Sequence, residues 1–322
     1  MKNQIETVAY SKIQHINVFF NNIVYRNFHT HKEMEFLCLI NGTATVNLYN
    51  RSIHAEAGSV IPVNYNEPHE IQANQSADFI IIQLSNHIFS EYFPQIETVY
   101  FQSQDLTQTL SEQEKTALWQ EIYRLSESYL FSPPLFELTC INAVTGLMKT
   151  LFDRCLPHFY TQQQYESNLQ TVGTLDRLFR YISENYRQKI SLAEFSEKAG
   201  YTPSYLSHFF KNKVGITFQE YVNNLRFEQA MRMIAKTEDS LYSIALECGF
   251  SDVKYMNRMF LKRLGCTPKE YRRRVRDNRA PEPIMKERFY SETRYSAADA
   301  ALLLNRYVKP LVFPDTHCKR SS

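Results

Sequence analysis

The sequence predicts a multidomain α+β fold, with a small β-barrel and a helical hairpin in the N-terminal half and an all-helical domain in the C-terminal half. Three observations predict it. Residues 13–84 hold short β-branched and aromatic segments between turn residues, residues 189–274 repeat one helical pattern twice, and the two halves of the chain carry opposite net charges. With 322 residues, the chain is long enough for two domains with separate cores.

The N-terminal region is predicted to be a β-sandwich or a small barrel. Its seven β-rich segments read INVFF, IVYRNF, MEFLCLI, TATVNLY, SVIPV, HEIQA and FIIIQL. Asn-Asn, Asn-Gly, Gly58 and Glu-Pro are expected to separate the strands. Many short strands with turn signals about 8–12 residues apart are typical of these two architectures.

Within this region, three histidines and one glutamate have a distinctive spacing. His29 and His31 are followed by Glu35 and, much later, by His69. The pattern H-x-H-x3-E-x6-G with a later His resembles the first motif of the cupin proteins, although the segment 58–69 lacks the glycine that is usual near the end of the second cupin motif. Residues at i and i+2 of a strand point to the same face, so these side chains are expected to converge.

The chemistry of this group is open to three interpretations. The side chains coordinate an Fe, Mn or Zn ion, as in a metallocupin enzyme. Alternatively, without a metal, they bind a sugar or an organic acid through hydrogen bonds. In the third interpretation they are polar core residues that satisfy one another. The expected neighbours of the site are Tyr25, Arg26, Tyr65 and Asn66.

The next region is predicted to form a helical hairpin. Apolar residues recur at helical spacing in 106–131 and again in 135–158, and Ser132-Pro133-Pro134 interrupts the pattern. Residues 161–168 are polar and lack apolar periodicity, so they are predicted to be the linker to the next domain. The first helix of that domain is expected at 169–185.

The C-terminal region repeats one helix–turn–helix pattern at a distance of about fifty residues, so that Gly200 aligns with Gly249. In each copy a short helix ends at that glycine, and Thr202 or Ser251 is placed to cap a second helix. The second helices are predicted to bury Leu206, Phe209, Phe210 and Val214 in the first copy and Met256, Met259, Phe260 and Leu264 in the second. The second helix of such a unit enters the major groove of DNA.

These two copies and the helix between them resemble the AraC/XylS transcription regulators. The resemblance rests on the helix 192–200, on Gly249-Phe250-Ser251-Asp252, on Phe260, and on Gly265-Cys266-Thr267-Pro268-Lys269-Glu270-Tyr271-Arg272. It implies a double helix-turn-helix domain in which one long helix, expected at 217–235, joins the two units. Such a helix is ~28 Å long, which is close to the ~34 Å between successive major-groove faces.

The resemblance extends to the N-terminal half. Gly58-Ser59-Val60-Ile61-Pro62 with His69 is similar to the effector-binding arm of AraC-type regulators, and the hairpin region often forms the homodimer contact in that family. Because a regulator holds its ligand and does not turn it over, the DNA-binding half favours a ligand pocket over a catalytic metal. The predicted effector-binding residues are therefore His29, His31, Glu35, His69, Tyr25 and Arg26, with no metal and no cofactor.

The DNA-contacting residues are expected on the outer faces of the two second helices. The candidates for base contacts are Ser204, Ser207, His208 and Lys211 in the first copy and Lys254, Asn257 and Arg258 in the second. Arg258 suits a guanine and Asn257 an adenine. The candidates for phosphate contacts are Lys262, Arg263 and Arg272. The alternative is that exposed polar residues on these faces contact only the DNA backbone.

The distribution of charge and of cysteine supports a division of labour. Residues 1–170 hold 9 Lys and Arg against 17 Asp and Glu, whereas residues 171–322 hold 27 against 17. A basic C-terminal half suits a DNA partner, because phosphate contacts supply most of the sequence-independent affinity. The six cysteines are scattered without a C-x-x-C spacing, and they are expected to be reduced and buried. There is no apolar N-terminal leader and no run of eighteen apolar residues, so the chain is expected to be cytoplasmic.

Taken together, the sequence predicts a transcription regulator, an activator, that binds double-stranded promoter DNA and is controlled by a sugar or organic acid. It is expected to form a homodimer, to contact RNA polymerase if it activates, and not to be an enzyme. The alternatives are a metal- or protein-binding regulator, a metallocupin enzyme fused to a DNA-binding domain, and a nucleoid-type DNA binder without an effector. The predicted divisions are 1–100 for the cupin-like barrel, 101–160 for the dimerising hairpin, 161–168 for the linker, 169–275 for the DNA-binding domain and 276–322 for an extension without an assigned role, either docked or loose.

Overall fold

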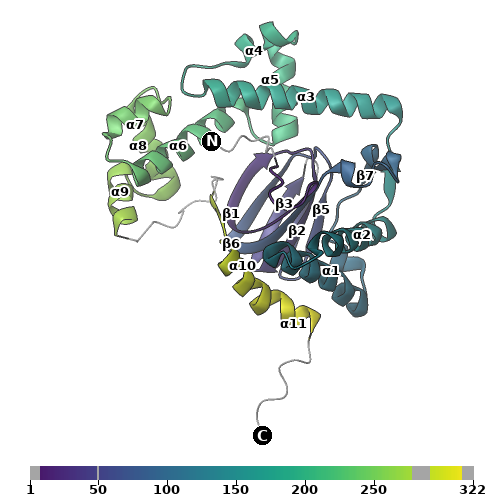
Figure 1. Ribbon diagram of the computed structural model, residues 1–322. Helices are drawn as coiled ribbons and strands as arrows, with labels where there is room; N and C mark the ends of the chain where they lie inside the picture. The colour runs from purple at the N-terminus through teal and green to yellow at the C-terminus, as the bar shows by residue number, and fades with distance from the viewer. Residues whose placement is uncertain (1–7, 49–50, 278–290, 314–322) are drawn as a thin grey trace. The chain divides into compact units, whose positions relative to one another are not determined.

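The computed structural model describes residues 8–48, 51–277 and 291–313. These residues divide into two compact units. The β unit contains the described residues up to 170 together with residues 291–313, and the helical unit contains residues 171–277. The expected fold class is confirmed, because a sheet with attached helices is followed by an all-helical unit (Figure 1).

The β unit is built on one strongly bent, seven-stranded sheet. Its strands are β1 (Ile16–His29), β2 (Met34–Asn41), β3 (Thr43–Leu48), β4 (Arg51–Glu56), β5 (Val60–Val63), β6 (His69–Leu84) and β9 (Ser291–Arg294). β1 and β6 pair antiparallel along most of their length, the second half of β6 also pairs with β2, and its first half pairs with β3. A separate two-stranded sheet joins β7 (Val99–Phe101) to β8 (Pro157–Phe159).

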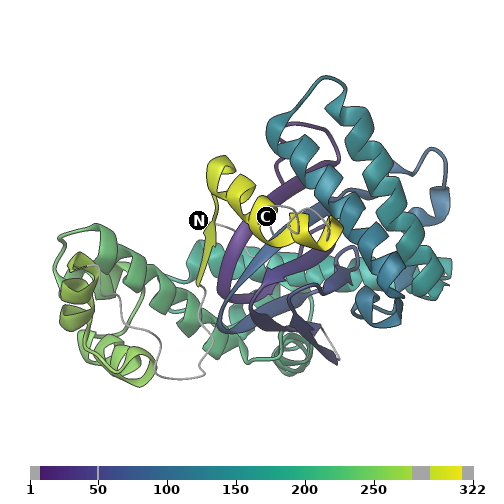
Figure 2. The same ribbon diagram turned by 90° about the horizontal axis from the view of Figure 1, so that it is seen from below.

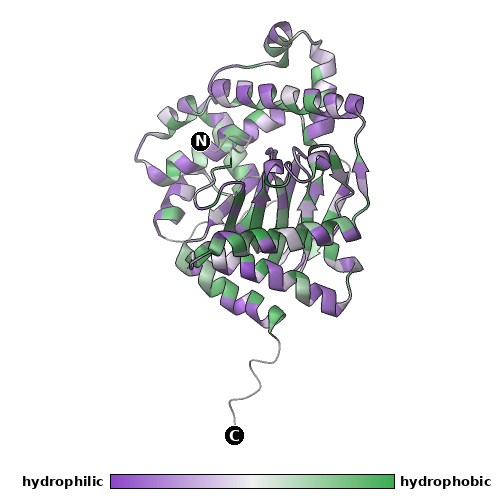
Figure 3. Cartoon of the chain, turned by 45° about the vertical axis from the view of Figure 1, so that its right-hand side comes forward, coloured by the Kyte–Doolittle hydropathy of each residue, from purple (hydrophilic) through white to green (hydrophobic). Residues whose placement is uncertain are grey.

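The central strands of the seven-stranded sheet are buried on both faces. Phe20 and Ile80 belong to an apolar cluster that also includes the helices of the unit, whereas Phe19 and Ile81, one residue away on the same strands, belong to a cluster made of strand residues. This alternation is the period-two pattern of a β-strand with two buried faces. In Figure 3 the strands are accordingly largely hydrophobic, while the helices are mixed.

The expected strand break at Asn21-Asn22 is wrong, because β1 continues through these residues. The Asn22 amide is accommodated by a buried carboxylate on β6, because its Nδ2 donates to Asp78 Oδ1 over 2.8 Å. The other oxygen of the same carboxylate, Asp78 Oδ2, accepts from Asn41 Nδ2 of β2 over 2.8 Å. Likewise, HEIQA and FIIIQL are the two ends of the single strand β6. Polar residues here mark cross-strand pairing and not a turn.

Two long helices pack against the sheet and against each other (Figure 1). They are α1 (Glu112–Phe131) and α2 (Phe136–Arg154). Short 3-10 turns precede them at Asn86–Ile88, Pro94–Glu97 and Leu106–Thr109. Ser111 and Glu114 form a reciprocal capping box at the start of α1, and the two prolines lie between the helices, as the sequence predicts for a hairpin.

The C-terminal segment docks on the β unit. β9 pairs antiparallel with β1, and it is followed by α10 (Ala297–Leu303), a π-turn (Leu304–Val308) and α11 (Lys309–Val312), which pack along α1 (Figures 1 and 2). Ser296 caps α10, as expected. Of the two expectations for this extension, docking therefore holds for residues 291–313. Residues 278–290 and 314–322 lie outside the described residues.

The helical unit contains two small cores that share one helix. Its elements are the part of α3 (Gln162–Asn185) from residue 171 onward, α4 (Leu192–Ala199), α5 (Pro203–Val214), α6 (Phe218–Lys236), α7 (Leu241–Glu247), α8 (Val253–Leu264) and α9 (Pro268–Arg276). In the first core, Phe210 packs on Phe179 and Tyr221. In the second, Phe260 packs on Phe227 and Tyr271. Because α6 supplies Tyr221 and Phe227, it belongs to both cores.

Two expected helix starts are wrong in detail. The helix expected at 169–185 begins at Gln162, so the predicted linker, 161–168, is helical after Thr161. Thr161 and Gln164 cap that helix: Gln164 N donates to Thr161 Oγ1 and Thr161 N donates to Gln164 Oε1. In the second repeat the cap of α8 is Asp252, whose carboxylate accepts from Tyr255 N over 2.6 Å, and not Ser251. The distance from the glycine to the cap is thus one residue longer in the second copy, from Gly249 to Asp252, than in the first, from Gly200 to Thr202.

Five cysteines in the described part of the chain are free and buried, and Cys318 lies outside it. Among the helices that the structure describes, none is long and apolar enough to cross a membrane.

Candidate functional sites

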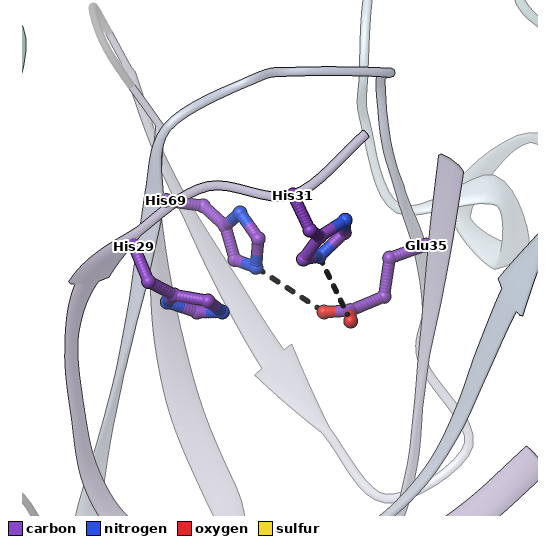
Figure 4. A group of neighbouring side chains, drawn as sticks. All are labelled: His29, His31, Glu35 and His69. Atoms are coloured by element: carbon purple, nitrogen blue, oxygen red, sulfur yellow. Dashed lines mark hydrogen bonds and ion pairs between the residues drawn. The ribbon is translucent and has the colours of Figure 1, made fainter. Parts of the chain in front are cut away.

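The four residues of the cupin-like spacing converge in the β unit (Figure 4). His29 ends β1 and is paired with His69 at the start of β6, Glu35 lies in β2, and His31 lies between β1 and β2. One ligand atom from each side chain lies within 4.8 Å of the ligand atoms of the others. The side chains are 4%, 2%, 0% and 0% exposed for His29, His31, Glu35 and His69. We call these four residues the His–Glu cluster.

All three imidazoles of the cluster are oriented in the same way by the main chain. Nδ1 of His29 donates to Asn27 O over 2.9 Å, Nδ1 of His31 donates to Glu33 O over 2.9 Å, and Nδ1 of His69 donates to Glu67 O over 3.0 Å. A carbonyl oxygen only accepts, so each Nδ1 carries the hydrogen. The Nε2 atoms are therefore the atoms directed to the centre of the cluster.

Glu35 lies between two of these imidazoles. Its Oε2 is 3.1 Å from His31 Nε2 and its Oε1 is 3.2 Å from His69 Nε2. Burial acts to raise the pKa of the Glu35 carboxyl, but the charge of His31 and the hydrogen bonds from His31 and His69 outweigh it and hold that pKa well below its usual range. Burial, and then the charge of Arg26, lower the pKa of His29 well below 6.5, so His29 is neutral.

A chain of hydrogen bonds through buried side chains connects Glu35 to α1. Gln83 Nε2 donates to Glu35 Oε2 over 2.9 Å, Asn17 Nδ2 donates to Gln83 Oε1 over 2.8 Å, and the Tyr129 hydroxyl of α1 donates to Asn17 Oδ1 over 3.4 Å. This chain fixes the carboxylate and connects the cluster to α1. Sequence reasoning missed Asn17 and Gln83, although both are polar residues in otherwise apolar strands.

The expected neighbours of the cluster are largely engaged elsewhere. Tyr25 donates its hydroxyl to Glu70 Oε2 over 2.8 Å, and Arg26 Nε lies 3.5 Å from Glu292 Oε2 of β9. Asn66 N donates to His31 O over 3.0 Å, so it positions the His31 loop with its main chain. Tyr65 packs against the helix-side apolar cluster. The prediction that Tyr25 and Arg26 bind the effector directly is therefore not supported by their contacts, because both are buried and already paired.

Two surface pockets of the β unit lie away from the His–Glu cluster. One lies between α1 and α2 and is lined by residues that include Leu118 and Thr150. The other lies between the β4–β5 turn, α1 and α11 and is lined by residues that include Gly58, Trp119 and Leu311.

In the helical unit, the predicted base-contacting residues of the first copy lie on the outer face of α5. Ser204, Ser207, His208 and Lys211 are exposed, and Leu206, Phe210 and Val214 are buried on the other face. Phe209 is half-buried, in contrast to its expected place in the core. It stacks on Tyr205, which stacks on Tyr201, with ring centroids 5.8 and 5.3 Å apart.

The second copy presents a comparable face on α8. Lys254 and Arg258 are exposed, Asn257 is half-buried, and the Arg258 guanidinium lies 5.5 Å from the centroid of the Tyr255 ring. Leu261, 51% exposed, follows Arg258 on the same helix. Sequence reasoning missed Leu261 and Tyr205, because a large apolar side chain in an amphipathic helix is expected in the core.

Two of the three predicted phosphate contacts are engaged within the unit. Arg263 is 9% exposed, donates to Asn224 Oδ1 over 2.5 Å and lies 4.8 Å from the centroid of the Phe227 ring. Arg272 donates to Asp239 O over 2.7 Å. The prediction for Arg263 is therefore wrong, since its side chain holds α8 against α6, and Arg272 supports the turn before α7. Lys262 is exposed.

Comparison with known proteins gives two family matches. Residues 18–127 match the AraC-like ligand binding domain, and residues 195–274 match a helix-turn-helix domain. The first match contains the whole His–Glu cluster, and the second contains α5, α6 and α8.

Similar proteins are regulators. An uncharacterised HTH-type transcriptional regulator of Staphylococcus aureus (strain MRSA252) is 25% identical over 276 residues, which cover 85% of this chain and 35% of the relative, so the chain spans about a third of that protein's length. The HTH-type transcriptional activator RhaR of Mannheimia succiniciproducens is 32% identical over 114 residues, covering 35% of this chain and 41% of RhaR. Among solved structures, ToxT from Vibrio cholerae is 14% identical, with 80% of this chain and 97% of ToxT covered and a TM-score of 0.42.

Both curated relatives are named as transcriptional regulators, which is the class that the sequence predicts. The repeated helix-turn-helix units, the β unit with its helices and these matches lead to one conclusion: the chain belongs to the AraC family of helix-turn-helix transcriptional regulators, with an AraC-like ligand-binding domain in its N-terminal half.

Proposed function

We propose that this chain is a sequence-specific DNA-binding regulator of transcription that a small-molecule effector controls through the β unit. The observation that supports it best is the pair of exposed polar faces on α5 and α8, each on the second helix of a helix-turn-helix unit. Because its target is promoter DNA, we expect it to work in the cytoplasm of a bacterial cell.

The two faces are held at a fixed spacing by α6. This helix has 19 residues, which corresponds to ~28 Å. Arg226 of α6 donates to Tyr186 O and to Gln188 O, each over 2.7 Å, and Asn223 Nδ2 donates to the Tyr255 hydroxyl over 3.0 Å. These bonds connect α6 to α8 and to the residues that follow α3, while Phe210 of α5 packs on Tyr221 of α6. In this proposal the two second helices enter successive major grooves on one side of the duplex.

On α8, we propose that Arg258 pairs with a guanine, that Asn257 pairs with an adenine and that Leu261 packs on a thymine methyl group. On α5, Ser204, Ser207, His208 and Lys211 are the proposed base contacts, and Tyr205 adds an aromatic surface beside them. Among the phosphate candidates, Lys262 keeps this role, since it is exposed. Its contacts are independent of sequence.

The test begins with duplexes selected by the full chain from a random pool. Arg258→Ala is expected to weaken binding to the selected site by ~1–3 kcal/mol, about 5- to 150-fold, and to relax preference at one base pair. Arg180→Ala is the matched control, because Arg180 is an exposed arginine of the same unit that pairs with Asp176 on α3. Unchanged affinity and unchanged preference for Arg258→Ala would show that α8 does not read bases.

For the effector, we propose a sugar or an organic acid. The support is the concentration of buried imidazole and carboxylate groups in the domain that matches AraC-like ligand binding. A ligand that binds only the folded state raises its thermal midpoint. Sugars and organic acids are screened on the full chain, and the thermal midpoint is measured from the fluorescence of its single tryptophan, Trp119 in α1, which reports on the β unit. Binding that changes the affinity for the selected DNA is the expected result. No stabilisation by any member of either class would exclude this effector chemistry.

We also propose that the hairpin forms a homodimer contact through α2. The face of α1 is shared with α10 and α11, but Leu135, Leu138 and Ile141, at the start of α2, are 70%, 63% and 42% exposed. Their spacing of three residues places them on one side of the helix. An exposed apolar stripe of this kind is typical of a protein contact, and a symmetric pair of such faces is the commonest arrangement in oligomers.

The direction of regulation is proposed to be activation, with RNA polymerase as a further partner. The support is the similarity to RhaR, which is named a transcriptional activator. A reporter gene placed behind the selected site is expected to rise in expression when the chain and its effector are both present.

A further inference from the structure

We propose that residues 291–313, which we call the docking segment, are an autoinhibitory element. While the docking segment is bound to the β unit it lowers the affinity of the helical unit for DNA, and its release raises that affinity. This inference rests on the proposed DNA-binding function and adds a mode of control to it. The docking segment lies outside both family matches, which end at residues 127 and 274, so neither match assigns it a role.

A short strand attaches the start of the docking segment to the edge of the sheet. β9 pairs antiparallel with β1, and Asn21 lies opposite Arg294. The Tyr295 hydroxyl donates to Asp78 Oδ1 of β6 over 2.6 Å. In the seven-stranded sheet β1 lies between β6 and β9, so release of β9 would leave this edge of β1 open to water.

The helices of the docking segment bury one apolar stripe against the β unit. Four side chains that recur every four residues are at most 3% exposed: Ala300, Leu304, Val308 and Val312. They belong to the same apolar cluster as Trp119 of α1, whereas Leu302, on the outer side, is 68% exposed. Burial of this stripe is the main favourable contribution to docking.

Three costs oppose this gain. Every residue of the docking segment loses backbone and side-chain freedom when it is ordered. Arg26 Nε lies 3.5 Å from Glu292 Oε2, and these side chains are only 5% and 3% exposed, so the desolvation of two charges offsets much of their attraction. Asn21 is 0% exposed, and its side-chain amide has no hydrogen-bond partner among the residues that the structure describes, which is also unfavourable. Docking is therefore balanced closely enough to be reversible.

The docking contact and the His–Glu cluster share one strand. β1 carries Arg26, which contacts Glu292 of the docking segment, and it ends at His29 of the cluster. After burial, the charge of Arg26 is the largest cause of the lowered pKa of His29, so the two positions also interact electrostatically. A ligand bound at the cluster therefore acts on the strand that holds the docking segment, and it is the expected signal for release.

Docking ties the helical unit to the β unit at both of its ends. At one end, α3 is a single helix whose residues up to 170 belong to the β unit. At the other end, residues 278–290 join the helical unit to β9. Two connections leave the helical unit fewer orientations than one does. Residues 1–170 hold 17 Asp and Glu against 9 Lys and Arg, and the phosphates of DNA repel this excess of negative charge. Fewer orientations of the docked chain keep the acidic unit away from a duplex, and the apparent affinity falls with that fraction.

The test compares DNA binding by the full chain with binding by variants of the docking segment. Val308→Asp places a charge in the buried stripe, and Leu302→Asp, the matched control, places the same charge on the exposed side. Affinity is measured for a duplex that the full chain selects from a random pool, and release is measured by amide hydrogen exchange of residues 297–312. We expect Val308→Asp to speed the exchange and to raise the affinity at least about 5-fold, the lower end of typical allosteric coupling. Leu302→Asp should change neither.

A reversible cross-link keeps the test decisive if Val308→Asp does not fold. Asn21→Cys combined with Arg294→Cys joins residues that lie opposite each other on β1 and β9, at a Cα separation of about 4.5–5.5 Å that a disulfide can span. The oxidised form is expected to bind the duplex more weakly than the reduced form, while the unsubstituted chain, whose described cysteines are free and buried, should respond to neither treatment.

Two results would overturn autoinhibition and leave DNA binding intact. One is an unchanged or lowered affinity of the Val308→Asp chain although its exchange is faster, and the other is equal affinity of the oxidised and reduced cross-linked chains. General damage to the fold lowers affinity, so a gain of affinity is specific to release. Failure of the full chain to select any duplex would instead refute the DNA-binding function on which this inference rests.

Discussion

The turn of the second repeat packs so closely that one methyl group should destabilise the helical unit. Gly249 has a φ of +80°, and a Cβ built on it would lie 2.5 Å from Tyr186 O and 2.7 Å from Arg187 Cα. Gly200 occupies the same place in the first repeat with a φ of +71°, but nothing lies within 4 Å of its Cβ position. The two glycines therefore differ in packing and share the same backbone conformation.

This difference separates two contributions to the loss of stability, the strain of the left-handed backbone and the close contact of the added methyl group. Placing alanine in the left-handed region costs roughly 1–2 kcal/mol, so Gly200→Ala should destabilise the unit by that amount. Gly249→Ala adds the cost of an overpacked contact, typically ~1–3 kcal/mol. The Tyr186 carbonyl cannot move away freely, because it accepts from Arg226 over 2.7 Å. We therefore expect a loss of about 2–5 kcal/mol for Gly249→Ala.

The assay follows the unfolding of each unit separately. Far-UV circular dichroism follows the helices of both units, while Trp119, the single tryptophan of the chain, reports on the β unit alone by fluorescence. The unfolding of the helical unit is therefore the part of the dichroism change that the fluorescence does not follow, and its midpoint is the dichroism midpoint compared below. For a domain of about 100 residues, 1 kcal/mol shifts the midpoint by ~4–8 °C. The dichroism midpoint should fall more for Gly249→Ala than for Gly200→Ala, while the fluorescence midpoint stays unchanged. Equal shifts for the two variants would refute the reasoning, because they would show that the close contact with Tyr186 carries no cost.

Three further predictions use matched pairs or a single charge. Arg263→Ala should lower the stability of the helical unit by ~1–3 kcal/mol, because a buried hydrogen bond is lost. Lys262→Ala should leave the stability unchanged and reduce the slope of log K for DNA binding against log salt concentration by about 1. The reverse pattern would restore Arg263 as a phosphate contact. Leu304→Ala should lower the stability of the β unit by ~2–5 kcal/mol, since Leu304 is 1% exposed. Leu302→Ala should lower it by less than ~0.5 kcal/mol, since Leu302 is 68% exposed. Comparable losses of stability would mean that the extension is not docked. Leu138→Glu should convert the dimer to a monomer, as measured by light scattering. If the unsubstituted chain is itself a monomer, the proposed α2 contact is wrong.

Several features followed from the sequence because they depend on neighbours along the chain. The glycines at 200 and 249, the buried stripes of α5 and α8, and the cap at Ser296 are set within one or two turns of helix. The family resemblance and the fold class rested on these local patterns and were confirmed. The exposed positions of Ser204, Ser207, His208, Lys211, Lys254 and Arg258 follow from the same periodicity, while their contacts with DNA stay predictions.

Tertiary structure decided what depends on residues far apart in the chain. The hydroxyl of Tyr295 donates to Asp78 Oδ1 over 2.6 Å across 217 positions, and no periodicity indicates that β9 would pair with β1. Arg263 follows another cationic residue in the sequence, yet its side chain is buried because it contacts the Phe227 ring and the Asn224 amide of α6. The spacing of the His–Glu cluster could be recognised in the sequence, but only the fold directs three Nε2 atoms and one carboxylate to a common centre. The reason is that the main-chain carbonyls that orient the rings take their positions only in the folded chain.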